Sequence, residues 1–221
     1  MRSGVIMHWL AATLKSSIGK KFVMAGSGLL LAFFLLAHLA GNAMAFFGRA
    51  TFDAYAERLH ATGPLIPVLE TTLALVFLIH IFFGLNLFFE NLAARPSRYE
   101  IGANSGGRTF ASMTMPYTGL LVLVFIFHHL AGFYLADSST VSDLVRQNLS
   151  RPVTAGYYIF SLLALTLHIS HGFWSMAQTL GLSHPKYDLL IERLALAASI
   201  VIGTVFIMIP VLVLFRPGFL S

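Results

Sequence analysis

Long runs of apolar residues alternate with short polar connections along the chain. The apolar runs cover about residues 22–47, 66–89, 113–136, 153–180 and 190–215. Each run reaches the roughly 20 residues that a helix needs to cross a bilayer, and a helix satisfies its own backbone hydrogen bonds in lipid. The pattern predicts an all-α integral membrane protein, with five transmembrane helices in a bundle that forms a single membrane domain, residues 1–221.

The composition agrees with this prediction. Of the 221 residues, 57% are hydrophobic and 10% are charged, and the mean hydropathy is +0.79, whereas soluble domains carry about 25% charged residues. The chain has no cysteine, which excludes disulfides, iron–sulfur clusters held by this chain and covalently attached c-type haem. Membrane topology explains the net charge of +5, because the basic residues flank apolar runs, and no nucleic-acid partner is expected.

The distribution of lysine and arginine predicts the orientation in the membrane, because cytoplasmic connections carry an excess of both residues. If the N-terminus is inside, the inner segments hold nine of these residues and the outer segments hold five. We expect the N-terminus inside and the C-terminus outside. The inner set is Arg2, Lys15, Lys20, Lys21, Arg95, Arg98, Arg108, Lys186 and Arg193, and the outer set is Arg49, Arg58, Arg146, Arg151 and Arg216.

An internal repeat singles out four histidines. Residues 27–41 align without a gap on residues 118–132, with eight of fifteen positions identical, and His38 falls on His129. A second histidine follows each copy: His80 opens H-I-F-F-G and His168 opens H-I-S-H-G. Self-similarity on this scale indicates a repeated structural unit, here an apolar helical hairpin that carries two histidines.

The four histidines are expected at two depths. His38 and His129 come late in spans that run outward, roughly 24 Å from the start at 1.5 Å per residue, which places them in the outer half. His80 and His168 come past the middle of spans that run inward, which places them in the inner half. Each tier then holds one histidine from each hairpin, and this predicts two stacked b haems with two imidazole ligands each. Two axial histidines leave the iron no open position, which favours electron transfer over oxygen chemistry.

Glycines follow each of these histidines at helical spacing. Gly41 and Gly132 come three residues after the outer pair, and Gly84 and Gly172 come four residues after the inner pair. We expect them to let a flat porphyrin approach the helix, although glycine and histidine at such spacings also occur in ordinary helix–helix packing.

Two further histidines lie beside the predicted ligands. His128 aligns with Ala37 and His171 aligns with Phe83, so the repeat does not assign them as ligands. Either could instead hydrogen-bond a haem propionate or the neighbour of a ligand.

The histidine pattern and several short motifs of the chain resemble a known family. It is the di-haem cytochrome b membrane anchor of succinate dehydrogenases and quinol:fumarate reductases, of the type with five spans and one anchor subunit. The resemblance covers nearly the whole chain, and its motifs are specific as a set and not singly. They are S-S-I-G-K-K (16–21), H-L-A-G-N (38–42), F-x-A-Y-A (52–56), H-I-F-F-G (80–84), E-N-L-A-A-R-P (90–96), T-M-P-Y-T-G (114–119), H-G-F-W-S (171–175) and T-L-G-L (179–182).

The resemblance implies a membrane subunit that binds a flavoprotein and an iron–sulfur subunit on the cytoplasmic face of the bacterial inner membrane. Its two b haems would carry electrons to or from a quinone, usually menaquinone, near the outer haem. His80 and His168 map to the ligands of the inner haem, and His38 and His129 map to those of the outer haem. No dicarboxylate chemistry is expected on this chain, which has no flavin motif and no cysteine.

The resemblance has limits at two sites. Some fumarate reductases of this type have an acidic residue for proton transfer two positions before the ligand of the fourth span, where this chain has Thr166, which puts that proton route in doubt. For the quinone site, Glu57 and His60 in the first outer connection are the candidates, followed by Asn42. Glu57 and Arg58 could equally form a solvated face.

Two other functions fit parts of the pattern. One is the di-haem b subunit of a membrane hydrogenase or formate dehydrogenase, although one ligand in each of the first four spans favours the anchor. The other is a transporter or structural membrane protein without haem, whose histidines relay protons or bind a metal. Against it, the two hairpins repeat with the same topology, and no charged residue lies in the middle of a span.

Overall fold

The chain folds into long helices that run back and forth. The computed structural model describes residues 12–13, 16–94, 110–134 and 140–221, and these form no strand. The predicted all-helical membrane fold is confirmed, because five helices are long and apolar enough to cross a membrane. They are α2 (Ser17–Ala43), which the 3-10 helix η1 (Met44–Phe47) extends, α4 (Leu65–Ala93), α5 (Phe110–Tyr134), α7 (Pro152–Thr179) and α8 (Asp188–Phe215).

The helix ends differ from the predicted spans where polar residues take part in the helix. α2 begins at Ser17 instead of residue 22, because the Ser16 side chain accepts a hydrogen bond of 3.0 Å from the Gly19 amide and caps the helix. α4 continues to Ala93, past residue 89, and Lys20 forms an ion pair with Glu90 there. Residues 95–109, which hold part of the basic charge used for the orientation, lie outside the described residues, as do residues 135–139 and most of 1–15.

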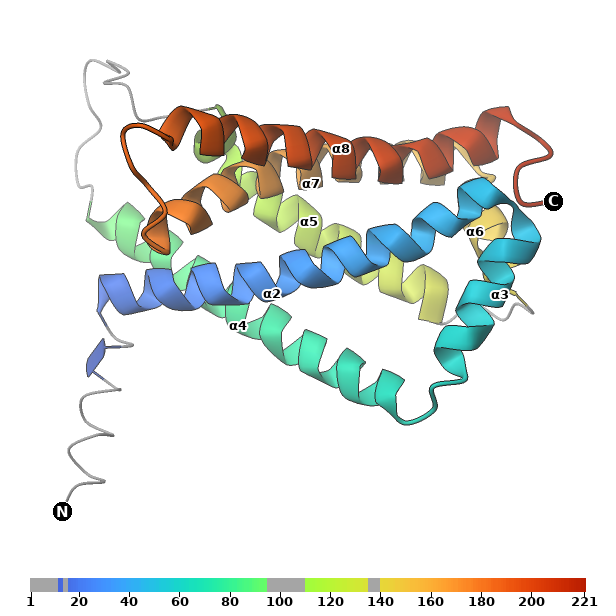
Figure 1. The fold of residues 1–221 in the computed structure, drawn as a ribbon, viewed down its shortest axis with the longest axis horizontal. Coiled ribbons are helices and arrows are strands. Elements are labelled where there is room, and N and C mark those ends of the chain that lie inside the picture. Colours follow the sequence, from blue (N-terminus) through green and yellow to red (C-terminus); the bar gives the residue numbers. More distant parts are fainter. Residues whose placement is uncertain (1–11, 14–15, 95–109, 135–139) are drawn as a thin grey trace.

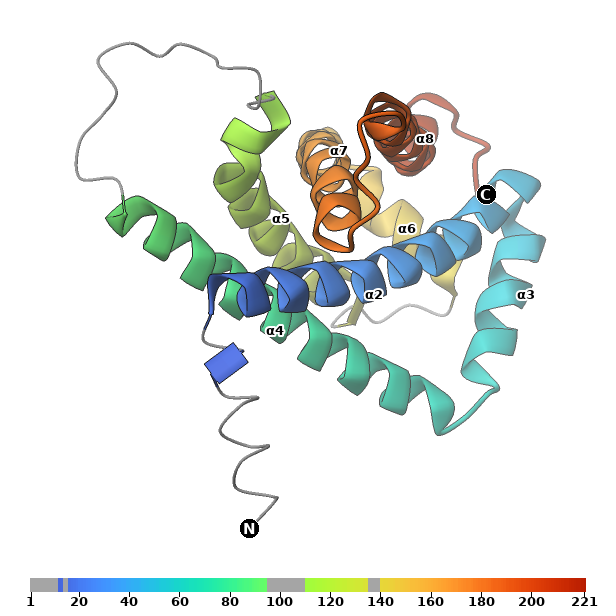
Figure 2. The same ribbon diagram turned by 60° about the vertical axis from the view of Figure 1, so that its left-hand side comes forward.

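The helices form two hairpins and one additional helix (Figure 1). α2 contacts α4, α5 contacts α7, and α2 and α7 contact each other across the two hairpins. α8 packs along α7 and also contacts α2. Two short helices, α3 (Arg49–His60) and α6 (Val141–Leu149), lie together with the C-terminus at one end of the bundle, here called the α3/α6 end. α2 and α4 are close at the opposite end and diverge towards α3 (Figure 2).

The short helices α3 and α6 were not predicted. Each lies in the polar connection inside one hairpin, so the repeated unit is long helix, short helix, long helix. Thr140 caps α6 by accepting a hydrogen bond of 3.2 Å from the Asp143 amide. Phe52 of α3 and Val145 of α6 are buried in the hydrophobic core at this end. Both helices are too short and too polar for a hydropathy pattern to reveal them.

Large apolar side chains cover much of the surface. No residue of α4 is buried, and the exposed fraction is 61% for Leu78 and Phe82 and 59% for Phe89. Such a surface would aggregate in water, whereas lipid tails solvate it as well as another helix would. The exposed surface therefore agrees with the assignment of these helices to a membrane.

Small residues allow α7 and α8 to pack closely. Ser161 of α7 and Ser199 of α8 are buried. The Thr166 hydroxyl donates a hydrogen bond of 2.8 Å to the Leu162 carbonyl, and its side chain fills the space beside Gly203 that a Cβ would need. Thr166 occupies the position where some fumarate reductases have an acidic residue for proton transfer. In this structure its side chain packs between α7 and α8.

This packing makes a prediction about Gly203. Gly203→Ala should lower the free energy of unfolding by about 1–3 kcal/mol, because the new methyl group overlaps Thr166. Thermal unfolding in detergent, followed by circular dichroism, measures the change. Gly156→Ala on α7 is the matched control, because its new methyl group meets no atom within 4 Å. Thr166→Ala should restore stability to the Gly203→Ala protein, and a failure to do so would contradict the assigned contact.

Candidate functional site

The first histidine pair lies towards the α3/α6 end. His38 of α2 and His129 of α5 face each other with ring centroids 6.0 Å apart and ring planes at 86°. Phe206 of α8 packs on His38 at 5.7 Å between centroids, and Phe125 lies 5.6 Å from His129. Aromatic rings therefore surround a pair of imidazoles drawn from both hairpins.

The second pair joins the other helices of the two hairpins. His80 of α4 and His168 of α7 have ring centroids 6.5 Å apart and ring planes at 72°. The structure thus brings together His38 with His129 and His80 with His168, which are the pairs expected from the repeat. Their role as haem ligands remains a prediction.

A glycine on the preceding helix contacts each histidine of the second pair. A Cβ on Gly28 would lie 3.4 Å from Cε1 of His80, and one on Gly119 would lie 3.2 Å from Cε1 of His168. From residue 28 to His38, and from residue 119 to His129, α2 and α5 each advance about 15 Å at 1.5 Å per residue. The two pairs are therefore separate tiers along the bundle.

Gly28 and Gly119 are site residues that the sequence reasoning missed. They occupy the same position of the internal repeat, next to Ser27 and Thr118 respectively. The alignment of residues 27–41 with 118–132 contained this signal, because the glycine is identical in both copies.

Two other glycines lie against side chains of the short helices. A Cβ on Gly41 would lie 2.8 Å from Cε1 of Tyr55, and one on Gly132 would lie 3.0 Å from Oδ1 of Asn148. The Asn148 side chain also donates a hydrogen bond of 2.8 Å to the Gly132 carbonyl. These glycines make room for side chains of α3 and α6, and their role beside a porphyrin stays a prediction.

The glycines after the second pair differ from each other. A Cβ on Gly84 would lie 3.5 Å from Cε of Met24, which is an ordinary packing contact. A Cβ on Gly172 would meet no atom of the described residues within 4 Å apart from its own stretch of helix, so this glycine differs from the other three.

The ring nitrogens have unequal surroundings. Nδ1 of His80 lies 3.1 Å from Oγ of Ser27, and Nε2 of His38 lies 3.3 Å from Nδ2 of Asn42. Nδ1 of His129 and Nδ1 of His168 are buried without a hydrogen bond from any described residue, although the Met115 backbone is near His168. Buried polar atoms without partners are rare and suggest a missing group.

The geometry of each pair suits one metal ion between two imidazoles. Bonds of about 2 Å from a metal to two opposite imidazole nitrogens separate the ring centres by roughly 6 Å, close to the observed 6.0 and 6.5 Å. The described part of the chain has no group of three or more histidine, cysteine, aspartate or glutamate side chains that could hold a metal. Two imidazoles without further protein ligands suit haem, whose macrocycle supplies the other four bonds.

The two neighbouring histidines lie outside the pairs. His128 is exposed, and its ring lies edge-on to Tyr157 with centroids 4.9 Å apart. His171 is half-buried, one helical turn after His168 on α7. The structure therefore pairs the same four histidines as the repeat alignment and leaves these two aside.

The three quinone candidates occupy different positions. Glu57 and His60 are exposed on α3, and Nδ1 of His60 lies 2.8 Å from the Ala56 carbonyl of the same helix. Asn42 is half-buried and is the candidate that contacts His38; its Nδ2 also donates a hydrogen bond of 2.9 Å to the His38 carbonyl.

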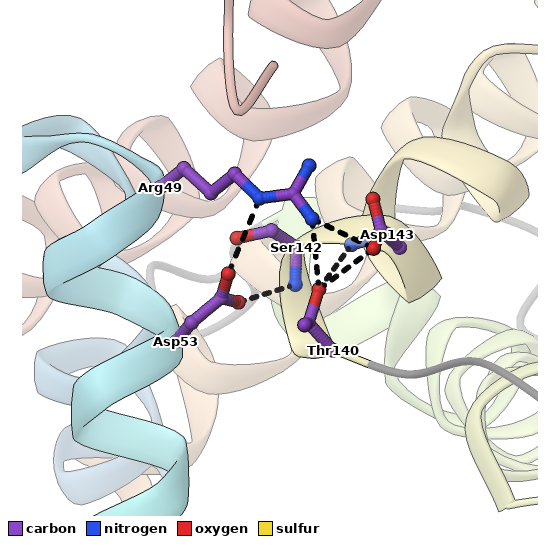
Figure 3. A network of polar contacts seen from close by, with 5 residues as sticks. All are labelled: Arg49, Asp53, Thr140, Ser142 and Asp143. Carbon is purple, nitrogen blue, oxygen red and sulfur yellow. Dashed lines mark hydrogen bonds and ion pairs between the residues drawn. The ribbon is translucent and has the colours of Figure 1, made fainter.

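A polar network next to the first tier joins α3 to α6 (Figure 3). Arg49 lies 2.7 Å from Asp143 and 3.4 Å from Asp53. The Ser142 amide donates a hydrogen bond of 2.9 Å to the Asp53 carboxylate, and Ser142 is fully buried. The sequence does not predict this network, because nothing in it shows that Asp53 and Ser142, 89 residues apart, meet.

The network predicts unequal effects on stability. Asp53→Ala should lower the free energy of unfolding by about 1–3 kcal/mol, because it leaves the buried Ser142 amide without an acceptor. Arg58→Ala on the same helix should change it by less than about 0.5 kcal/mol, because Arg58 is exposed. Thermal unfolding gives both values, and hydrogen exchange should show faster opening of α3 in Asp53→Ala alone. Equal effects of the two variants would contradict the network.

Comparison with known proteins adds one similarity. No family model and no solved structure matches the chain. The chain is 27% identical over 154 residues to the succinate dehydrogenase cytochrome b558 subunit of Bacillus subtilis (strain 168), which covers 68% of this chain and 73% of that protein.

Proposed function

We propose that the chain is the membrane-anchor cytochrome b subunit of a succinate:quinone or quinol:fumarate oxidoreductase, and its similarity to the succinate dehydrogenase cytochrome b558 subunit supports this proposal. The observation that carries the proposal is the arrangement of four histidines as two pairs, each made across the two hairpins and at its own depth. A relay or transport site would not require two equivalent pairs at metal-bridging separation.

Each pair has an assigned haem in this proposal. His80 and His168 hold the inner b haem, and His38 and His129 hold the outer b haem. When bound, the haems supply one-electron transfer between the two faces of the membrane. The protein holds the two pairs at two levels, and aromatic side chains of α5 and α8 pack against the outer pair.

The proposed partners follow from the orientation. With the N-terminus inside, the bundle end opposite α3 and α6 faces the cytoplasm and binds the flavoprotein and the iron–sulfur subunit. Lys20 and Glu90 lie at that end. The α3/α6 end then faces outward, and menaquinone exchanges electrons near the outer haem in the bacterial inner membrane. The chain takes part in the oxidoreductase reaction as its haem and quinone subunit.

Haem content tests the proposal. We expect about two b haems per chain in the purified protein from its native source, measured by the pyridine haemochrome assay and the reduced-minus-oxidised spectrum. Alanine at any of the four paired histidines should remove the haem of its tier, because a single imidazole no longer holds it. His184→Ala, in the exposed turn before α8, is the control.

Three outcomes are decisive for this test. Retention of both haems in His128→Ala and His171→Ala would support the assigned pairs. Loss of haem in either of these variants, with retention in a paired-histidine variant, would overturn the assignment. A folded native protein without haem would exclude the cytochrome and favour a transporter or structural protein.

The quinone site is tested by substitutions in the assembled complex. If Glu57 or His60 binds the quinone head group, Glu57→Gln or His60→Ala should raise the KM for a menaquinone analogue about tenfold, the loss of one hydrogen bond of about 1.4 kcal/mol. Asn42→Ala should also change the spectrum of the outer haem, because Asn42 contacts His38. Arg58→Ala on α3 should leave the KM unchanged. An unchanged KM in all three candidate variants would place the site elsewhere.

A further inference from the structure

Ser27 connects the backbone of α2 to the ring of His80. Its side chain is buried, with an exposed fraction of 7%. Oγ lies 2.7 Å from the Val23 carbonyl oxygen, 3.2 Å from the Met24 carbonyl oxygen and 3.1 Å from Nδ1 of His80. The next residue, Gly28, lies against Cε1 of the same ring. Two consecutive residues of α2 thus define where the imidazole sits.

These distances favour one arrangement of the hydrogen bonds. A hydroxyl has one proton to donate, and a carbonyl oxygen can only accept. The contact with the Val23 carbonyl, at 2.7 Å, is the shortest and favours donation of the Ser27 proton there. The contact with His80 would then have Ser27 Oγ as acceptor and Nδ1–H as donor. A histidine protonated at Nδ1 and neutral has its free lone pair on Nε2, the nitrogen that is left to bind a metal.

The second hairpin lacks this contact. Thr118 occupies the repeat position of Ser27, but its hydroxyl lies 3.1 Å from both the Thr114 and the Met115 carbonyl oxygens of its own helix. Gly119 contacts the His168 ring as Gly28 contacts His80, yet no hydroxyl is bonded to Nδ1 of His168, and the polar group near that ring is the backbone of Met115. The two ligands of the proposed inner haem are therefore held by equivalent glycines and by unequal polar groups.

We propose that Ser27 is a positioning residue that fixes His80 as an Nε2 ligand and lowers the reduction potential of the inner haem. The role follows from chemistry, because an acceptor at Nδ1–H makes an imidazole a stronger electron donor and stabilises the ferric state. The haem part of this inference rests on the proposed function, whereas the tautomer of His80 is a property of the protein alone.

The first experiment measures the reduction potentials of the two haems in the complete complex by spectroelectrochemistry. In Ser27→Ala, the ratio of reduced to oxidised inner haem at a fixed potential should rise about tenfold, equivalent to about +59 mV for one electron. The outer haem should keep its potential. Ser27→Thr keeps a hydroxyl and should retain the wild-type value.

Thr118→Val is the matched control for this measurement. It removes the hydroxyl from the equivalent position beside the opposite ligand of the same haem, where the hydroxyl makes no hydrogen bond to His168. We expect the inner haem to keep its potential. An equal shift in Thr118→Val, or no shift in Ser27→Ala with both haems bound, would overturn the role of Ser27.

The second experiment does not depend on haem. Nitrogen-15 NMR of histidine-labelled protein prepared without haem should show His80 protonated at Nδ1, and Ser27→Ala should convert part of this population to the Nε2–H tautomer. His184 is an internal reference, because it lies in the exposed turn before α8. A wild-type His80 protonated at Nε2 would overturn the inference. If native protein lacks haem but His80 has the Nδ1–H tautomer, the proposed function fails and the contact stands.

Discussion

An imidazole inside a membrane-spanning helix needs a partner, and the bundle is arranged around this requirement. Lipid offers no hydrogen bonds, so polar side chains inside a span favour positions that face the interior of the bundle. The four histidines lie there in facing pairs, with one member from each hairpin. Each pair joins helices that are distant in the sequence. Contacts between apolar side chains alone would not specify which helices meet, because lipid tails contact those side chains equally well.

Packing around the pairs uses small residues in a consistent way. Gly28 and Gly119 give the second-tier histidines a flat surface on the preceding helix. Gly41 and Gly132 accept Tyr55 and Asn148, which fixes the short helices on the first tier. Glycine thus has two roles, contact with a histidine ring and contact with a side chain of a short helix. The side chain that lies opposite determines the role, and the spacing from a histidine does not.

The sequence revealed the parts of the fold that have a strong local signal. Five apolar runs of sufficient length predict five spans, and an internal repeat with histidines at fixed positions predicts which helices face each other. α3 and α6 were missed because a short amphipathic helix in a connection resembles a polar loop. The contact of Arg49 with Asp143 was missed because it joins connections of separate hairpins. The contact of Ser27 with His80 depends on the rotation of α2 about its axis, which a repeat does not specify.

The additional helix makes the two copies of the repeat unequal. α7 lies between α5 and α8, while α4, its counterpart, has α2 as its main neighbour and buries no residue. On the exposed face of α4, away from His80, substitutions are therefore limited mainly by hydropathy, since lipid accommodates apolar side chains of many shapes. On α7 they are limited by volume, since the seam at Thr166 and Gly203 accepts no added methyl group. The two equivalent helices α4 and α7 should therefore tolerate different numbers of substitutions.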